Sequence, residues 1–493
     1  MEQHMKIRPL LFPAAVILFC LFVLTASPVP AVATGSPDGE MVVHTADLET
    51  CLQTALENNR RRPASRYAVE MAEAQHRQAL AGYWPQISLQ GGYQLMDQDP
   101  NYIFPANNFN LPMGGTIPIT IPGVGTMPTN AITIPEQDIK LMDRESFRAS
   151  VQGSWLVYDG GMRKGLREQA EGLVDIMQQE ARRTDLEIMD SVKRLYFGAV
   201  LATQLHQVGQ DTLARMEATL NLTETMYKEG SGTVKKTDWL GNKVMVESLR
   251  SMVASLEKNE LMAQAALANT MGLPWHASVR PVDREMPFTP FAEQLDGLVG
   301  TAYRFNPDWA KIEAGIRAAE GSLRTAKSGH LPKLAVTGEL FKWWNDYDAG
   351  MATDRNKEGW SVGMGVEIPI FSGFLTQSRV AEARARVAKI KEEQFLLQEG
   401  IGLQLRDIFL SLGAAEKSHQ ATLDAMGAAV ENRDLNTRAY QHALVDTEDV
   451  IQAQLMEALM SAQHYRARYD HIALQSRMNL VVGTEVLKKL HQE

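Results

Sequence analysis

The sequence contains little cysteine and none of the residue patterns that most often carry enzyme chemistry. Only Cys20 and Cys51 are cysteines among the 493 residues, and neither a His-Glu-x-x-His nor a Cys-x-x-Cys pattern occurs. Those patterns are typical of zinc and redox centres. His464 and His471 are seven residues apart, a spacing that would suit ligands on one helix face, but packing or solvent exposure explains them better. We therefore predict a protein that is not an enzyme and has no cofactor or metal site.

Long apolar runs are also scarce. One run, residues 10–24, follows Lys6 and Arg8 and precedes the small residues 31–33, which is the pattern of an export signal with its cleavage site. The run is short of the roughly 20 apolar residues that a membrane-spanning helix needs, so cleavage is favoured over a retained anchor. We predict a signal peptide over residues 1–33 and a mature chain over residues 34–493.

The mature chain has no later run that is long and apolar enough for a transmembrane helix. An exported chain of this kind is either soluble beyond the inner membrane or a β-barrel. Lipid attachment at Cys20 is an alternative to simple cleavage, although Phe19 occupies a position that needs a small residue. Removal of the signal leaves Cys51 as the single cysteine, which excludes an internal disulfide. The net charge of −10 argues against nucleic acid as a partner.

The mature chain contains two copies of one unit. Ala55, Asn59 and Pro85 each recur 247 residues later, and Asp238 and Gly272 each recur 211 residues later. Similarity at a nearly fixed offset indicates one supersecondary unit used twice. We predict repeat one over residues 48–274, a linker over residues 275–294 and repeat two over residues 295–483.

Four segments alternate apolar and polar side chains, two in each repeat. In the first, Ile87, Leu89 and Tyr93 alternate with Ser88 and Gln90. The other three lie at residues 147–157, 334–340 and 360–370. About ten residues let a tilted strand cross the hydrocarbon layer, with one face toward lipid and one toward a wet lumen. Half-buried strands of a soluble sandwich are the alternative.

Four strands are too few for a closed barrel, which needs about eight. An open sheet edge cannot lie in lipid, because unpaired backbone groups there cost several kcal/mol each. Strands that span a bilayer in this protein must therefore be pooled from several chains, in a cyclic homo-oligomer.

The first repeat has an insertion between its two strands, residues 97–140, rich in proline, glycine, asparagine, isoleucine and threonine. Such a composition is typical of an extended, irregular loop. Its place between two strands predicts a surface loop at the outer, extracellular end of the barrel.

The helices are expected to be much longer than those of a globular domain. No proline occurs from Gly161 to Lys228 or from Phe374 to Ala443, and each stretch could reach about 100 Å as a helix. Turns are expected at residues 227–237 and 440–447. Heptad-spaced apolar seams, which favour coiled-coil packing, occur at Ile401, Leu405, Ile408, Leu412 and Ala415, and at Ile451, Leu455, Ala458, Ala462, Tyr465, Tyr469 and Ile472.

The mature chain resembles the TolC-like outer-membrane efflux channel family over nearly its whole length. The features that carry the resemblance recur in the same order, namely Cys51-Leu52-x-x-Ala55-Leu56-x-Asn58-Asn59, Trp84-Pro85-Gln86, Tyr158-Asp159-Gly160-Gly161, Pro369-Ile370-Phe371-Ser372-Gly373 and Tyr440 through Asp449-Val450-Ile451-x-Ala453. The resemblance implies a homotrimer with a twelve-stranded β-barrel in the outer membrane of a Gram-negative bacterium and an α-helical coiled-coil tunnel across the periplasm. It also implies a periplasmic adaptor and an inner-membrane pump as partners.

The resemblance further implies a gate at the periplasmic end of the tunnel. Thr237 and Asp238 on the first hairpin and Tyr440 on the second match the positions that hold the family's gate closed. Asp449 matches an acidic ring, where converging carboxylates would favour cations and raise one another's pKa. N-terminal helix capping is the alternative role for Asp238 and Asp449.

This sequence departs from the family pattern at two gate positions. Val445 replaces a gating arginine, and Gln452 replaces a second ring acid, so closure would depend on fewer charged contacts. The expected function is a passive, gated outer-membrane export channel. A periplasmic coiled-coil adaptor without a pore and an outlet dedicated to one secreted polypeptide are the alternatives.

Overall fold

The computed structural model describes residues 42–110, 116–121, 125–129, 131–141, 143–230, 234–344, 357–442 and 444–484. The expected signal peptide, residues 1–33, lies outside the described residues. The helices and the four-stranded sheet belong to one unit, Val43–Glu493.

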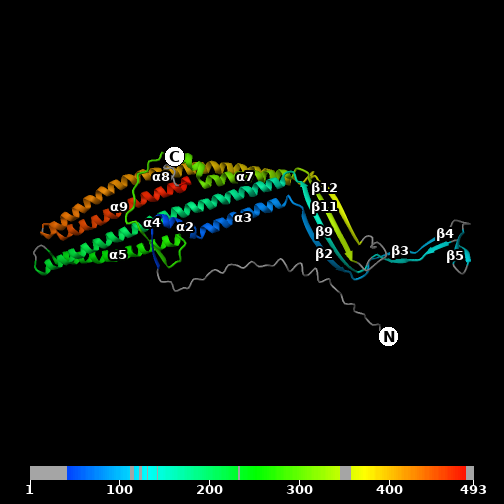
Figure 1. Cartoon of the computed structure of the whole chain (residues 1–493), viewed down its shortest axis with the longest axis horizontal. Coiled ribbons are helices and arrows are strands. Elements are labelled where there is room, and N and C mark those ends of the chain that lie inside the picture. The colour runs from blue at the N-terminus through cyan, green and yellow to red at the C-terminus, as the bar shows by residue number, and fades with distance from the viewer. Residues whose placement is uncertain are drawn as a thin grey trace, which may run out of the picture. The chain divides into compact units, whose positions relative to one another are not determined.

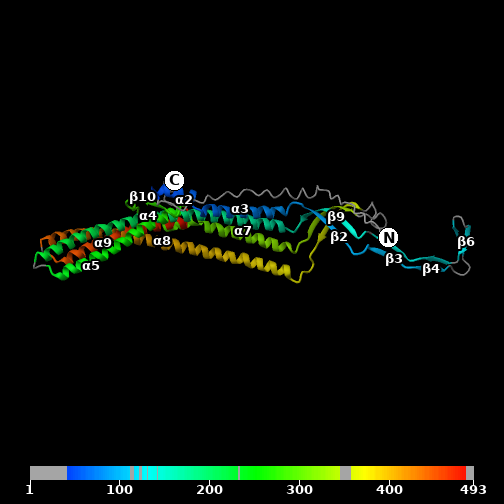
Figure 2. The ribbon, with the colours of Figure 1, turned by 90° about the horizontal axis from the view of Figure 1, so that it is seen from below.

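The long helices form where the sequence lacks proline. α4 spans Met162–Lys228 and α8 spans Leu375–Gln441, which confirms the two predicted long helices. α4 follows a turn with positive φ at Gly160 and Gly161, a conformation that glycine adopts without strain. After short turns, α5 (Lys236–Thr270) and α9 (Thr447–Val482) run back along them. Figures 1 and 2 show these turns at the far end of the helices from the strands.

Four shorter helices precede the strands, two in each repeat. They are α2 (Leu48–Asn58), α3 (Arg61–Ala81), α6 (Leu295–Phe305) and α7 (Pro307–Ser328). α3 and α7 both pack on α4, and α7 also packs on α8. The second half of the chain therefore repeats the element order of the first.

The strands form one sheet in the order β12-β11-β9-β2. Its members are β2 (Gln86–Leu95), β9 (Glu145–Tyr158), β11 (Lys333–Trp344) and β12 (Glu358–Glu367). The register places apolar residues in one row, Leu89, Val151, Leu340 and Trp360, and polar residues in the next, Ser88, Gln152, Glu339 and Ser361. The predicted alternation is therefore confirmed, but β12 ends before Ile368 and Ile370, because Pro369 has no N–H for the ladder.

The insertion between β2 and β9 is not the irregular loop that its composition predicted. Its described residues form successive antiparallel pairs, β3 with β8, β4 with β7 and β5 with β6. These strands are β3 (Asn101–Phe104), β4 (Asn107–Asn110), β5 (Ile117–Ile121), β6 (Gly125–Thr129), β7 (Ala131–Ile134) and β8 (Gln137–Lys140). Isoleucine and threonine favour strands, and a two-stranded ribbon has only edge strands, where proline is tolerated. We call residues 101–140 the ribbon.

The matched residues of the two repeats make matching contacts. Asn59 Nδ2 donates to Thr270 O at 2.7 Å, and Asn306 Nδ2 donates to Val481 O at 2.7 Å. Gly483 has a φ of +81°, and a Cβ there would lie 2.2 Å from Phe305 O. In each repeat, the end of the helical hairpin therefore packs against the end of a short helix, α2 in the first repeat and α6 in the second. The contact is so close that only glycine fits at Gly272 and Gly483.

Each repeat contributes most of one apolar core, and the first core also includes Ile472 of α9. The two cores are centred on matching residues of the long helices, Val192 in α4 and Leu405 in α8, both fully buried. Ile401, Leu405, Ile408 and Leu412 of the predicted seam are buried. Cys51 is a free, buried cysteine in the first core.

The seam predicted for α9 is displaced by one residue from the stripe that is most deeply buried. That stripe is largely polar: Gln454, Glu457, Ser461, His464 and His471 are all less than a tenth exposed, and Val450, Ala453 and Ala467 are buried among them. The residues of the predicted seam lie beside it, and most are only partly buried. A hydrophobic period does not reveal a stripe that consists largely of polar side chains.

The predicted linker, residues 275–294, begins with strand β10 (Ala277–Pro281), which pairs with β1 (Val42–Ala46). Its next residues lie across the helices of both repeats through several hydrogen bonds. None of the helices among the described residues has the length and apolar character required to span a membrane.

Candidate gate at the helix turns

The turns between α4 and α5 and between α8 and α9 bring the four expected gate residues into one region. Tyr440 lies buried in the last turn of α8. Thr237 and Asp449 lie exposed, and Asp238 half-buried, in the first turns of α5 and α9. α4 packs on both α5 and α9, so side chains from both repeats meet here.

The Tyr440 hydroxyl joins three helices. It lies 2.8 Å from Thr223 Oγ1 on α4 and 2.9 Å from Thr447 Oγ1 on α9. All three side chains are less than a tenth exposed, and hydrogen bonds among buried hydroxyls are costly to leave unmade. The structure thus assigns Tyr440 two threonine partners within the same chain.

Asp238 and Asp449 hold equivalent positions at the starts of α5 and α9. Asp238 Oδ2 accepts from Lys235 N at 2.9 Å, and Asp449 Oδ2 accepts from Asp446 N at 3.2 Å. Each carboxylate lies in the first turn of its helix, where it also faces the positive end of the helix dipole. The capping role that was the alternative for both residues is therefore present in the structure.

Within this chain, Asp238 is joined to Thr237 and not to Tyr440. Thr237 Oγ1 donates to Asp238 Oδ1 at 3.1 Å. The two departures from the family pattern lie at the same turn: Val445 is half-buried, and Gln452 Nε2 donates to Glu448 Oε1 at 3.1 Å on the exposed side of α9. Neither supplies the charge expected at its position.

A polar network that the sequence did not reveal continues from Tyr440 along α9. Gln454 Nε2 donates to Thr219 Oγ1 at 3.1 Å. Glu457 lies 2.6 Å from Arg215 Nη2 on α4 and 3.4 Å from Arg433 Nη1 on α8. Because the Glu457 side chain is largely buried and contacts two arginines, its charge is paired rather than isolated. These two charged contacts of Glu457 therefore lie inside the bundle, about three helical turns from the start of α9.

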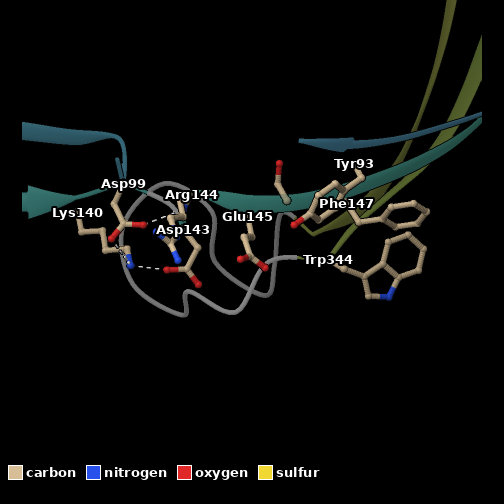
Figure 3. A pocket seen from close by; sticks show the side chains of 9 residues that line it. Tyr93, Asp99, Lys140, Asp143, Arg144, Glu145, Phe147 and Trp344 are labelled. Carbon is tan, nitrogen blue, oxygen red and sulfur yellow. Dashed lines mark hydrogen bonds and ion pairs between the residues drawn. The ribbon is translucent and has the colours of Figure 1, made fainter. Parts of the chain in front are cut away.

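A second group of charges lies at the base of the ribbon (Figure 3). Lys140 Nζ lies 2.9 Å from Asp99 Oδ2 and also contacts Asp143, while Arg144 N donates to Asp99 Oδ1 at 2.7 Å. Hydrogen bonds from Lys140 and then from Arg144 lower the pKa of Asp99, and those from Lys140 to Asp143 and Asp99 raise the pKa of Lys140. These ion pairs hold the two ribbon strands together where they leave the sheet.

An open cavity of about 440 Å³ lies beside these charges. Figure 3 shows Phe147 and Trp344 next to each other on its far side, with Tyr93 nearby; the rings of Phe147 and Trp344 have centroids 5.1 Å apart. Aromatic side chains at the end of a strand are typical of the boundary between lipid and water.

Comparisons with known proteins identify the class. The family model described as outer membrane efflux protein matches residues 51–273 and 298–484, and the chain therefore belongs to the outer membrane efflux protein family. It is an outer-membrane channel of an efflux or secretion system, with an extension into the periplasm.

Individual relatives are distant but cover most of the chain. The outer membrane efflux protein BepC of Brucella suis is 22% identical over 65% of this chain and 70% of its own length. The outer membrane protein TolC of Escherichia coli is 21% identical over 71% of each chain. The solved structure of the outer membrane protein VceC from Vibrio cholerae superposes with a TM-score of 0.68 at 15% identity, covering 89% of this chain and 96% of that one. The chain therefore has the fold of these channels.

Proposed function

We propose that three copies of this chain form one channel, a twelve-stranded barrel in the outer membrane with a coiled-coil tunnel of helices through the periplasm. The observation that carries this proposal is the sheet β12-β11-β9-β2, in which the outer edge of β12 and the outer edge of β2 pair with no other strand among the described residues. One face of that sheet is apolar along its length. Lipid does not tolerate an open edge, so neighbouring copies must supply the missing strands.

The channel is passive in this proposal, and the chain performs no catalysis. A pump in the inner membrane supplies the energy and a periplasmic adaptor joins the pump to the tunnel. The helix turns, which lie at the far end of α4 and α8 from the sheet (Figure 1), are the place where such an adaptor would meet the channel. The chain itself supplies the path across the outer membrane.

The gate in this proposal is the region of Thr237, Asp238, Tyr440 and Asp449. The hydroxyl of Tyr440 holds α4, α8 and α9 together when the tunnel is closed, which is supported by its two buried threonine partners. Asp449 is exposed and free to face the axis with its copies, where it favours cations. The hydrogen bond that the Asp449 carboxylate accepts from Asp446 N then fixes the direction of that carboxylate.

The other segments of the chain each have a role in this proposed channel. Residues 1–33 are the export signal, and repeats 48–274 and 295–483 each contribute two strands and one helical hairpin. Residues 275–294 join the repeats, and the insertion, residues 97–140, projects into the extracellular space. The same architecture serves small-molecule efflux and the outlet of a secreted polypeptide, so the cargo is set by the pump.

The trimer is tested with purified, processed protein in detergent. Light scattering corrected for detergent should give three times the mass of one chain, and planar bilayers should show discrete single-channel conductance. A monomer that is stable without detergent and forms no channels would instead identify a periplasmic scaffold without a pore. Discrete conductance from a protein of monomeric mass would overturn the trimer alone.

A further inference from the structure

The segment that follows β10 ties the two repeats together. We call residues 283–291 the strap. On its first side it contacts α4, where Tyr196 Oη donates to Asp283 Oδ2 at 2.8 Å. On its other side it contacts α8 and α9, through Glu416 Oε1, which accepts from Phe291 N at 2.7 Å, and Gln475 Nε2, which donates to Thr289 O at 2.8 Å. The strap therefore bridges the first repeat to the hairpin of the second.

The middle of the strap is held by a cluster of aromatic and histidine rings. The ring of Phe288 stacks on His419 of α8, with centroids 3.8 Å apart and planes within 20°. Phe288 also meets His471 of α9 at 4.6 Å, and His464 lies 5.0 Å from His419. His464 and His471 are 3% and 0% exposed. Two imidazoles thus contact the phenyl ring of Phe288, and the third, His464, lies against His419. All three lie outside the candidate gate.

The imidazoles have little to stabilise a positive charge. Among the described residues, no hydrogen-bond partner exists for His419 Nδ1 or for either ring nitrogen of His471. Glu416 Oε1 lies 3.7 Å from His471 Nε2, and it already accepts from the strap backbone. The described residues also include no group of three metal-ligating side chains placed to hold an ion, so the cluster is not a metal site in this arrangement.

The fixed charges next to the cluster are one carboxylate and one guanidinium group. Glu416 of α8 is the carboxylate that faces it, while Arg468 of α9 adds a fixed positive charge next to His419 and His464. Arg468 also donates to Met286 O of the strap. The remaining ionisable side chains of the strap and of α4 at this contact are Asp283, Arg284, Glu285 and Tyr196, of which Asp283 and Tyr196 bond to each other.

The pKa values follow from this setting. Burial, and then the charges of Arg468 and His471, lower the pKa of His419; burial, His419 and Arg468 lower that of His464. Burial lowers the pKa of His471, and Glu416 opposes the change. A histidine whose pKa is lower in the folded state adds stability above its unfolded pKa of about 6.5, and that stability is lost as the pH falls.

We propose that Phe288, His419, His464 and His471 form an acid-sensitive clasp, which holds the strap on α8 and α9 when the imidazoles are neutral and releases it when they are protonated. Imidazolium groups at His419 and His464, whose ring centroids are 5.0 Å apart, would repel each other, His471 and Arg468 more strongly than Glu416 could compensate. Each would also need water, which a stacked phenyl ring excludes. Release of the strap loosens the bridge between α4 and the second hairpin, and this role is separate from the gate.

Amide hydrogen exchange of the full-length processed protein in detergent micelles tests the clasp. Peptides that cover residues 283–291 are compared at about pH 7.5 and about pH 5, with rates corrected for intrinsic chemical exchange. Exchange of the strap should be at least about tenfold faster in acid, because a tenfold change corresponds to one histidine shifted by one pKa unit. Peptides from the ribbon should not change.

The variant His419→Gln/His464→Gln/His471→Gln cannot acquire the charges and should lose the acid response. His442→Gln, at the exposed end of α8, is the matched control and should keep it. If the triple variant does not fold, the single variant His419→Gln, at a half-buried site, must reduce the acid response. A strap that exchanges equally fast at both pH values, or histidine variants that respond like wild type, would overturn the clasp. Neither result depends on conduction or on trimer formation.

Discussion

The closed state of the proposed gate depends on a single side-chain group, the hydroxyl of Tyr440. Tyr440→Phe keeps the ring but removes the bonds to Thr223 and Thr447, each of which contributes about 1 kcal/mol. The closed state should lose most of this stability, so the open probability in planar bilayers should rise by about tenfold. Tyr227→Phe is the matched control, because Tyr227 stacks on Trp239 through its ring, which phenylalanine retains. Equal open probabilities in the two variants would place the gate elsewhere.

A substitution at Asp449 distinguishes the effect of its negative charge from the effect of its capping hydrogen bond. Asp449→Asn removes the negative charge but keeps an oxygen that can accept from Asp446 N. We expect lower cation selectivity, seen as a shift of the reversal potential toward zero in a salt gradient, with the same thermal stability as wild type. Glu448→Gln, one residue earlier on the exposed side of α9, should change the reversal potential less. An unchanged reversal potential in Asp449→Asn would rule out the acidic ring.

The sequence identified the gate residues through their resemblance to a family pattern, but not their contacts. Tyr440 was predictable as a position, whereas its threonine partners come from α4 and α9 and depend on how three helices pack. Glu457 and Gln454 were missed, since a polar residue in a helix is ordinarily expected to face solvent. Only the three-dimensional contact between the repeats indicates that this stripe is buried.

At the scale of elements, the sequence predicted the helices and strands closely and the connections poorly. The lack of proline identified α4 and α8, and alternation identified the four strands of the sheet. The ribbon was predicted as an irregular loop because its prolines and glycines mask strands that tolerate them at an edge. The strap was predicted as a linker because backbone contacts with distant helices leave no local pattern.

The glycine at the end of each hairpin provides an element-scale test. Gly483→Ala forces a Cβ against Phe305 O and an alanine into a φ of +81°, which together cost about 2–4 kcal/mol. The apparent melting temperature in detergent should fall by roughly 5 °C or more.

Gly427→Ala is the matched control for that substitution. A Cβ at Gly427 meets nothing within 4 Å in the chain, and alanine favours a helix over glycine by about 1 kcal/mol. Its melting temperature should therefore stay the same or rise. A Gly483→Ala protein as stable as wild type would mean that the second hairpin does not close on α6 in solution.

For the whole molecule, the ribbon is expected to be dispensable for assembly. Its described strands pair only with one another, and Asn101 and Lys140 are cross-strand partners. Residues 102–139 can therefore be replaced by an Asn-Gly turn, which joins paired strands directly. The shortened protein should still have three times the mass of one shortened chain and should keep the single-channel conductance of wild type. Loss of the oligomer after this replacement would instead assign the ribbon a role between copies.

In the proposed trimer, the two sheet edges that have no partner among the described strands have a genetic consequence. A chain whose edge strand is damaged would still join intact copies through its other edge and would spoil the ring that it enters. With intact and damaged chains made in equal amounts, only about one eighth of three-membered rings would contain no damaged copy. A plasmid-borne edge mutant made in equal amounts should therefore reduce export to about one eighth in cells that carry a normal chromosomal gene.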